Sequence, residues 1–233
     1  MKDLSYIQEY YICVINKNGN LPVLNYLSAA VCLGVGELME LAGYGCLARD
    51  DKGMISVAKP YEGSLPYLMP IYETLARKKE PVDIENVLFV YMPDVDILTL
   101  TIWDIPVTKT KPLSDLLTPI GESLTAAGYA SKITPPDSKK PKYAPKPEAV
   151  ERIIEKIRAA FLGVSGIPAE TLYLTALLEK SGVLSSFFDK HEISAIISLI
   201  EESRKSGTDT SVKEILGYTD AIPRIAAKLG CGG

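Results

Sequence analysis

Apolar residues recur at the spacing of an α-helix through much of the chain. The repeat i, i+3, i+4, i+7 is clearest in the C-terminal half, where it predicts amphipathic helices within 150–161 and 193–200. An apolar pattern beginning near Ala169 predicts a helix between these two. Similar stripes predict helices within 4–14 and 113–124. The polar and apolar pattern is therefore typical of a mainly α-helical protein.

The longest uncharged stretch, residues 18–36, predicts a central helix from about Pro22 to Ala42. It is long enough to resemble a transmembrane segment. Asparagine, proline and serine interrupt it, however, and Glu37 and Glu40 follow at once. Its apolar residues are mostly small, which lets neighbouring helices approach closely. We therefore expect a buried helix at the centre of a bundle.

Two segments break the helical pattern. A short turn ending in glycine separates two apolar runs and predicts a β-hairpin between Leu47 and Val57, whose exposed edge is a candidate for self-association. Residues 131–147 are rich in proline and lysine and are interpreted as an exposed loop with a short extended piece at 142–144. The expected fold is a single mainly α domain, a helical bundle over residues 1–203 with a small β-hairpin. Residues 204–233 form a C-terminal extension with short helices.

The number and placement of the charged residues argue against a nucleic-acid-binding protein. The 233 residues include 25 basic and 29 acidic side chains, for a net charge of −4. The order helix, helix, hairpin through Ala58 would also suit a winged-helix DNA binder. DNA affinity comes chiefly from Lys and Arg on phosphates, and no Lys or Arg lies between Lys17 and Arg49. The winged-helix alternative is disfavoured, and no nucleic-acid partner is expected.

No enzyme class emerges from the residues that carry chemistry. The one histidine, His191, lies at a helix boundary, where Asp189 suits an N-cap and Glu192 suits the first turn. The cysteines match no CxxC or zinc spacing, and a phosphate-binding glycine loop is absent. The cysteines are Cys13, Cys32, Cys46 and Cys231. We expect no catalytic residue, no metal and no cofactor. The first residues are not a signal peptide, so a cytoplasmic location is expected.

One basic segment could meet an anionic surface. Lysines flank and fill the loop at 131–147, with Tyr143 in its middle, and two more precede it. A lysine-rich segment with an aromatic side chain can contact an anionic membrane, with about 1 kcal/mol from each charge near the surface. The alternative is a solvated loop with no ligand. The candidate contact residues are Lys109, Lys111, Lys139, Lys140, Lys142, Tyr143 and Lys146.

Four passages together resemble the Golgi phosphoprotein 3-like family of phosphatidylinositol-4-phosphate-binding proteins, which has bacterial members. They are residues 4–10, 36–45 with the hairpin that follows, 124–129 and 171–184. The likeness spans roughly residues 4 to 203. It implies a helical domain around a central apolar helix, and a non-catalytic, peripheral membrane or adaptor function that binds phosphoinositide or other anionic headgroups.

The family's lipid site does not carry over by residue type. Its tryptophan and three arginines fall at Asn25, Gly34, Ser114 and Leu117, and none of the four types is kept. Its Arg-Gly-Arg/Lys element reads Tyr-Gly-Cys at 44–46, while its membrane-facing loop maps onto the lysines of 139–146. The alternative is therefore a protein–protein interaction or oligomerisation domain of the same fold, without lipid binding.

Overall fold

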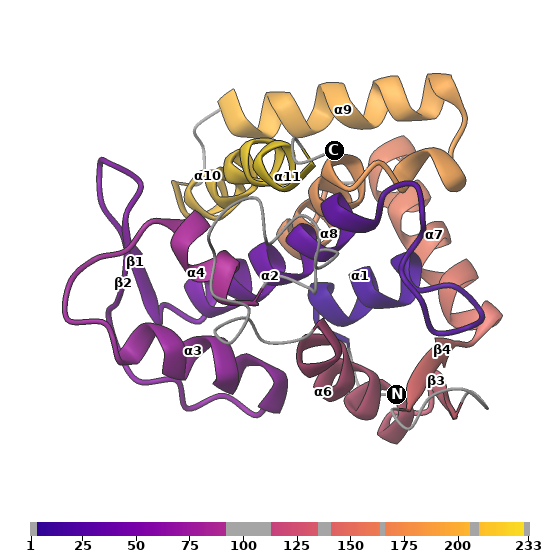
Figure 1. Ribbon diagram of the computed structural model, residues 1–233. Helices are drawn as coiled ribbons and strands as arrows, with labels where there is room; N and C mark the ends of the chain where they lie inside the picture. Colours follow the sequence, from indigo (N-terminus) through magenta and orange to yellow (C-terminus); the bar gives the residue numbers. More distant parts are fainter. Residues whose placement is uncertain (1–3, 92–112, 135–140, 164–165, 206–209, 231–233) are drawn as a thin grey trace.

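The computed structural model describes residues 4–91, 113–134, 141–163, 166–205 and 210–230. Helices dominate it, and the only strands in these ranges form two small antiparallel hairpins, which confirms the mainly α fold class. In Figure 1, α1 (Tyr6–Val14) and α2 (Tyr26–Gly43) occupy the middle of the bundle. A continuous apolar core draws residues from nearly every element.

The helix α1 begins with a capping box. The Ser5 hydroxyl accepts a hydrogen bond from the backbone N–H of Gln8, and the Gln8 side chain accepts one from the backbone N–H of Ser5. All nine residues of α1 are buried. It packs between α2 and α8 (Ala169–Lys180), and an ion pair between Glu9 and Lys156 joins it to α7 (Pro147–Leu162).

The helix α2 is the apolar helix that the sequence predicts, beginning at Tyr26 rather than near Pro22. It is long and apolar enough to cross a membrane, but 72% of its span is buried inside the protein. Glycines set its contacts. A Cβ at Gly36 would lie 2.4 Å from Cδ1 of Ile7, and one at Gly34 would lie 2.6 Å from Cδ2 of Leu88. The missing side chains let α1 and α4 (Ile84–Tyr91) come close to α2.

The first hairpin follows α2 as predicted. Strands β1 (Leu47–Arg49) and β2 (Ile55–Val57) pair antiparallel, with Leu47 opposite Val57. The outer edge of β2 is bridged, because Ile55 exchanges two backbone hydrogen bonds with Val82. Any self-association through this hairpin would therefore use the edge of β1. The 3₁₀ turn η1 (Pro66–Leu68) and the helix α3 (Met69–Ala76) come next along the chain.

The interpretation of 131–147 as one exposed loop is wrong in part. Residues Ala130–Ile133 form β3, which pairs with β4 (Lys142–Pro145) and places Lys132 opposite Tyr143. The extended piece at 142–144 is confirmed as part of β4. This second hairpin packs on α6 (Leu113–Ala126), at the bottom of Figure 1. The alternation of polar and apolar side chains is too short here to be read as two strands.

The C-terminal helices cover the top of the bundle in Figure 1. After α8 come η3 (Leu184–Ser186), α9 (Lys190–Lys205), α10 (Thr210–Gly217), η4 (Tyr218–Ala221) and α11 (Ile222–Gly230). The predicted cap of α9 is confirmed, since Asp189 accepts hydrogen bonds from the backbone N–H of His191 and Glu192 at 2.8 and 2.9 Å. Both α10 and α11 contact α2, so the segment predicted as an extension shares the core of the bundle.

Gly121 offers a direct test of the packing between α6 and β4. A Cβ at this position would lie 2.3 Å from Cγ of Tyr143, inside the ring's van der Waals radius. We expect Gly121→Ala to lower the free energy of unfolding by about 1–3 kcal/mol in urea titrations. The control is Gly166→Ala, where no atom lies within 4 Å. Equal stabilities for the two variants would contradict this packing.

Candidate functional site

The described lysines of the predicted membrane contact lie on or beside the second hairpin. Lys142 donates a hydrogen bond from Nζ to Oδ1 of Asn20 at 2.6 Å, and Lys146 is half-buried at the N-cap of α7. Lys132 is exposed on β3, with its Nζ 6.0 Å from the centre of the Tyr143 ring. The other four predicted contacts lie outside the described residues: Lys109, Lys111, Lys139 and Lys140.

Tyr143 lies elsewhere than the sequence suggests. Its side chain is only 2% exposed, and its hydroxyl lies 3.2 Å from Oε1 of Glu122, to which it donates a hydrogen bond. The ring rests on the glycine surface at Gly121. The expectation of an exposed aromatic residue that inserts into a membrane is therefore corrected, because this ring is part of the core.

The described positions of the family's lipid site carry no charged side chain. Gly34 is buried against Leu88, and Leu117 packs half-buried against the core. Asn25 is the N-cap residue of α2, and its side-chain amide lies beside Gly182. The side chain of Ser114 is outside the described part. None of the three described residues at these positions has a cationic side chain that could neutralise a phosphate.

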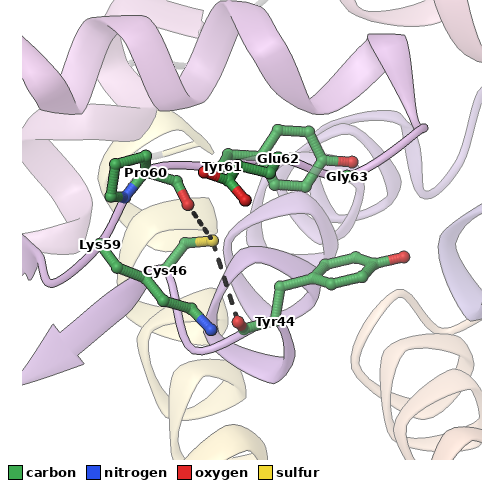
Figure 2. Close-up of a pocket in the computed structure, with 7 residues that line it drawn as sticks. All are labelled: Tyr44, Cys46, Lys59, Pro60, Tyr61, Glu62 and Gly63. Atoms are coloured by element: carbon green, nitrogen blue, oxygen red, sulfur yellow. Dashed lines mark hydrogen bonds between the residues drawn. The ribbon is translucent and has the colours of Figure 1, made fainter.

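The C-terminal end of α2 opens into two adjoining cavities that share Tyr44. The smaller has a volume of about 340 Å³ and is the pocket drawn in Figure 2; the larger, about 590 Å³, is named here the α2 cavity. Both lie at the end of the 36–45 passage that resembles the family. The smaller pocket is lined by Tyr44 and Cys46, two of the three positions that replace the family's basic element.

The cysteine that lines the smaller pocket, Cys46, is not an activated nucleophile. Figure 2 shows the Cys46 thiol directed at two backbone carbonyls, with Sγ 3.6 Å from the oxygen of Pro60 and 3.9 Å from that of Tyr44. Burial raises the pKa of the Cys46 thiol, and Lys59 opposes this only in part. A raised pKa disfavours the nucleophilic thiolate. Cys13, Cys32 and Cys46 are all buried free thiols.

The α2 cavity contains a buried carboxylate. Glu40 is 5% exposed and lines the cavity from α2. The Tyr67 hydroxyl donates a hydrogen bond to Oε2 of Glu40 at 3.1 Å and lies 2.6 Å from Oγ of Ser5. Burial is the main reason that the pKa of Glu40 rises to about 7. At neutral pH this carboxyl is therefore divided between its protonated and ionised forms.

The other polar groups of the α2 cavity are tyrosines and a second acid. Tyr6 and Tyr173 meet edge to face, with ring centres 5.5 Å apart. The Tyr6 hydroxyl is buried and has no hydrogen-bond partner among the described residues. Burial, and then Glu40, raise the pKa of Tyr6. Glu170 lines the cavity from the exposed first turn of α8.

Ion pairing divides the buried glutamates of the described chain into two kinds. Glu9 pairs with Lys156, and Glu85 pairs with Arg224 and Lys228 of α11. Glu37 and Glu40 have no cation within 4 Å among the described residues. No three potential metal ligands meet anywhere in that part either. Two uncompensated carboxylates in one apolar helix are therefore the chief chemical feature of this end of α2.

Sequence reasoning overlooked this feature, although a signal was present. Glu37 and Glu40 served only to argue against a transmembrane helix. Their spacing of three places both on one face of α2, and the surrounding residues are apolar. That combination indicates buried carboxyl groups. The aromatic and acidic residues that complete the α2 cavity come from distant segments, which no local pattern connects.

Comparison with known proteins gives one match. The family model described as Golgi phosphoprotein 3 (GPP34) matches residues 8–219, which is most of the chain. No curated protein matches significantly.

Glu37 provides a test of the buried acid pair. Burial, and then Glu40, raise its pKa well above the ordinary value, and its side chain is 1% exposed. An acid whose folded-state pKa is raised keeps its proton while the unfolded chain loses it. Stability therefore falls as pH rises above the unfolded pKa of about 4.3, by up to about 1.4 kcal/mol per pH unit.

Glu37→Gln resembles the protonated form and removes this dependence. Urea unfolding at pH 5, 6 and 7 measures the free energy of unfolding of the variant minus that of the wild type. We expect this difference to grow with pH, by at most about 1.4 kcal/mol per unit. The exposed Glu148→Gln on α7 should show no such trend. A constant difference for Glu37→Gln would contradict a protonated, buried Glu37.

Proposed function

Because the chain belongs to the Golgi phosphoprotein 3 (GPP34) family, we propose that it is a non-catalytic adaptor that contacts anionic membranes peripherally through the β3–β4 hairpin. The carrying observation is the placement of lysines on this hairpin. Lys132 and Lys142 lie on paired strands, and Lys146 follows directly at the start of α7. A basic surface of this kind attracts an anionic leaflet.

A neighbouring turn adds a further lysine beside this hairpin. The turn that contains Lys17 lies against β4, since a Cβ at Gly19 would lie 2.6 Å from Cβ of Lys142. Lys139 and Lys140 belong to the segment that connects the two strands. Glu122 of α6 accepts the hydrogen bond of the Tyr143 hydroxyl. With Tyr143 in the core, this contact depends on charge rather than on insertion of an aromatic ring.

Charge-based contact implies little selectivity for the headgroup. The positions that correspond to the family's lipid site are apolar or uncharged at Asn25, Gly34 and Leu117. None of these positions has an arginine, so bidentate recognition of a phosphate by a guanidinium group is not possible there. The hairpin lysines act as separate point charges and respond to surface charge density.

The charge of the hairpin can be tested by vesicle flotation. Lys132, Lys139 and Lys140 are changed together to Glu, and the matched control changes Lys52, Lys78 and Lys79, which are exposed elsewhere. Each lysine contributes about 1 kcal/mol near an anionic surface, so we expect the first variant to bind phosphatidylserine vesicles at least a hundredfold more weakly at low salt. The control should bind within threefold of the wild type. Failure of the wild type to float, or equal loss in both variants, would contradict the proposal.

Headgroup selectivity is tested with vesicles matched in surface charge. We expect phosphatidylserine vesicles and phosphatidylinositol-4-phosphate vesicles to bind the wild type equally within about threefold, because no described residue at the family positions can clamp a phosphate. High salt should release both, since it screens the lysines. A preference above tenfold for the phosphoinositide would show a headgroup site that this account lacks.

A further inference from the structure

We propose that the α2 cavity binds a small organic cation, a compound with a protonated primary amine, between Glu40 and the hydroxyl of Tyr6. Its volume of about 590 Å³ falls within the range of small-molecule sites. Among the described residues that line it there is no Lys, Arg or His. This site is separate from the hairpin surface, and it selects the opposite charge.

Glu40 supplies the charge that recognises the amine. Its carboxylate is held by the Tyr67 hydroxyl, which donates to Oε2, and Tyr67 is fixed in turn by Ser5. A carboxylate can accept about four hydrogen bonds, so acceptor capacity remains for a ligand. The buried glutamates elsewhere are neutralised by lysine or arginine of this chain. An ammonium group in the cavity would do the same for Glu40.

The Tyr6 hydroxyl is the second, independent observation. It lines the same cavity, the side chain is 6% exposed, and the hydroxyl has no partner among the described residues. A buried hydroxyl without a hydrogen-bond partner destabilises the protein. An ammonium N–H directed at Oη of Tyr6 would satisfy it, while a second N–H of the same group donates to Glu40.

Aromatic rings complete a lining suited to a cation. Tyr6 and Tyr173 form the edge-to-face pair within the cavity, and Tyr44, 45% exposed, stands where the two cavities adjoin. The faces of aromatic rings attract cations electrostatically. Glu170 adds a second negative charge from α8. Glu40 and Glu170 would repel a phosphate or carboxylate, so the cavity excludes anionic ligands.

Binding of a cation is expected to depend on pH. The titratable groups around Glu40 are acidic: Glu37 on α2, Glu170 on α8, and the phenols of Tyr6, Tyr44, Tyr61 and Tyr67. A cation favours the ionised form of Glu40, whose pKa in the free protein is about 7. Raising the pH from 6 to 8 ionises this carboxyl and should strengthen binding about tenfold.

The test uses the full chain and 1,4-diaminobutane as probe, measured by titration calorimetry at low salt. We expect binding with a Kd below 1 mM at pH 8, about tenfold weaker at pH 6. The uncharged 1,4-butanediol, which has the same length, should not bind. Choline, which has no N–H, should bind more weakly than the diamine.

Variants locate the site. Glu40→Gln should weaken binding of the diamine at least tenfold and remove the pH dependence of binding. Tyr6→Phe should weaken binding of the diamine severalfold. The pH dependence of binding should remain, because Glu40 is still present. Glu37→Gln is the matched control, one turn away and outside the cavity lining, and it should bind like the wild type. Thermal unfolding of each variant confirms that it is folded.

The proposal is overturned if the wild type does not bind the diamine at 10 mM. It is also overturned if folded Glu40→Gln or Tyr6→Phe binds as the wild type does, or if the diol or choline binds as tightly as the diamine. Should Glu40→Gln fail to fold, the decision rests on Tyr6→Phe, which removes one oxygen atom and no charge.

Discussion

The close packing of α2 against its neighbours is the constraint on which the rest of the structure depends. Gly34 and Gly36 leave no room for a side chain, since a Cβ at either would overlap Leu88 of α4 or Ile7 of α1. This approach buries α2 on nearly every side and requires small residues at the contacts and no Lys or Arg along the helix. It also determines where the chain can carry charge, because basic residues are displaced to the periphery, including the hairpin β3–β4.

The same packing explains the unusual acids at the end of α2. A helix that must be buried up to its last turn carries Glu37 and Glu40 into the core with it. Structural glutamates in this core, Glu9 and Glu85, are neutralised by lysine and arginine from α7 and α11. Glu40 instead faces a cavity with tyrosines. A buried carboxyl without a cation partner costs stability, and the ammonium group proposed above would neutralise it.

Much of the fold could be predicted from sequence because its strongest signals are local. The i, i+3, i+4, i+7 stripes give α7 and α9, the uncharged run gives α2, and the glycine turn gives the first hairpin. The sequence pattern does not predict the second hairpin, because β3 and β4 are only four residues each and form a hairpin that packs on α6. The burial of Tyr143 is likewise not predicted, because it depends on Gly121, which lies more than twenty residues earlier in the chain. The α2 cavity is assembled from α1, α2, α8 and α10, so its members share no pattern along the chain.

The central claim is that buried α2 brings an ionisable carboxyl into the cavity at its end. The most direct measurement is a pH titration of the glutamate side-chain carboxyl carbons by NMR. The account predicts one resonance with a midpoint near pH 7, well above the ordinary value of about 4.3, which is absent in Glu40→Gln. A wild-type titration that lacks this resonance, with Glu40 titrating in the ordinary range of about 4.3, would contradict the account.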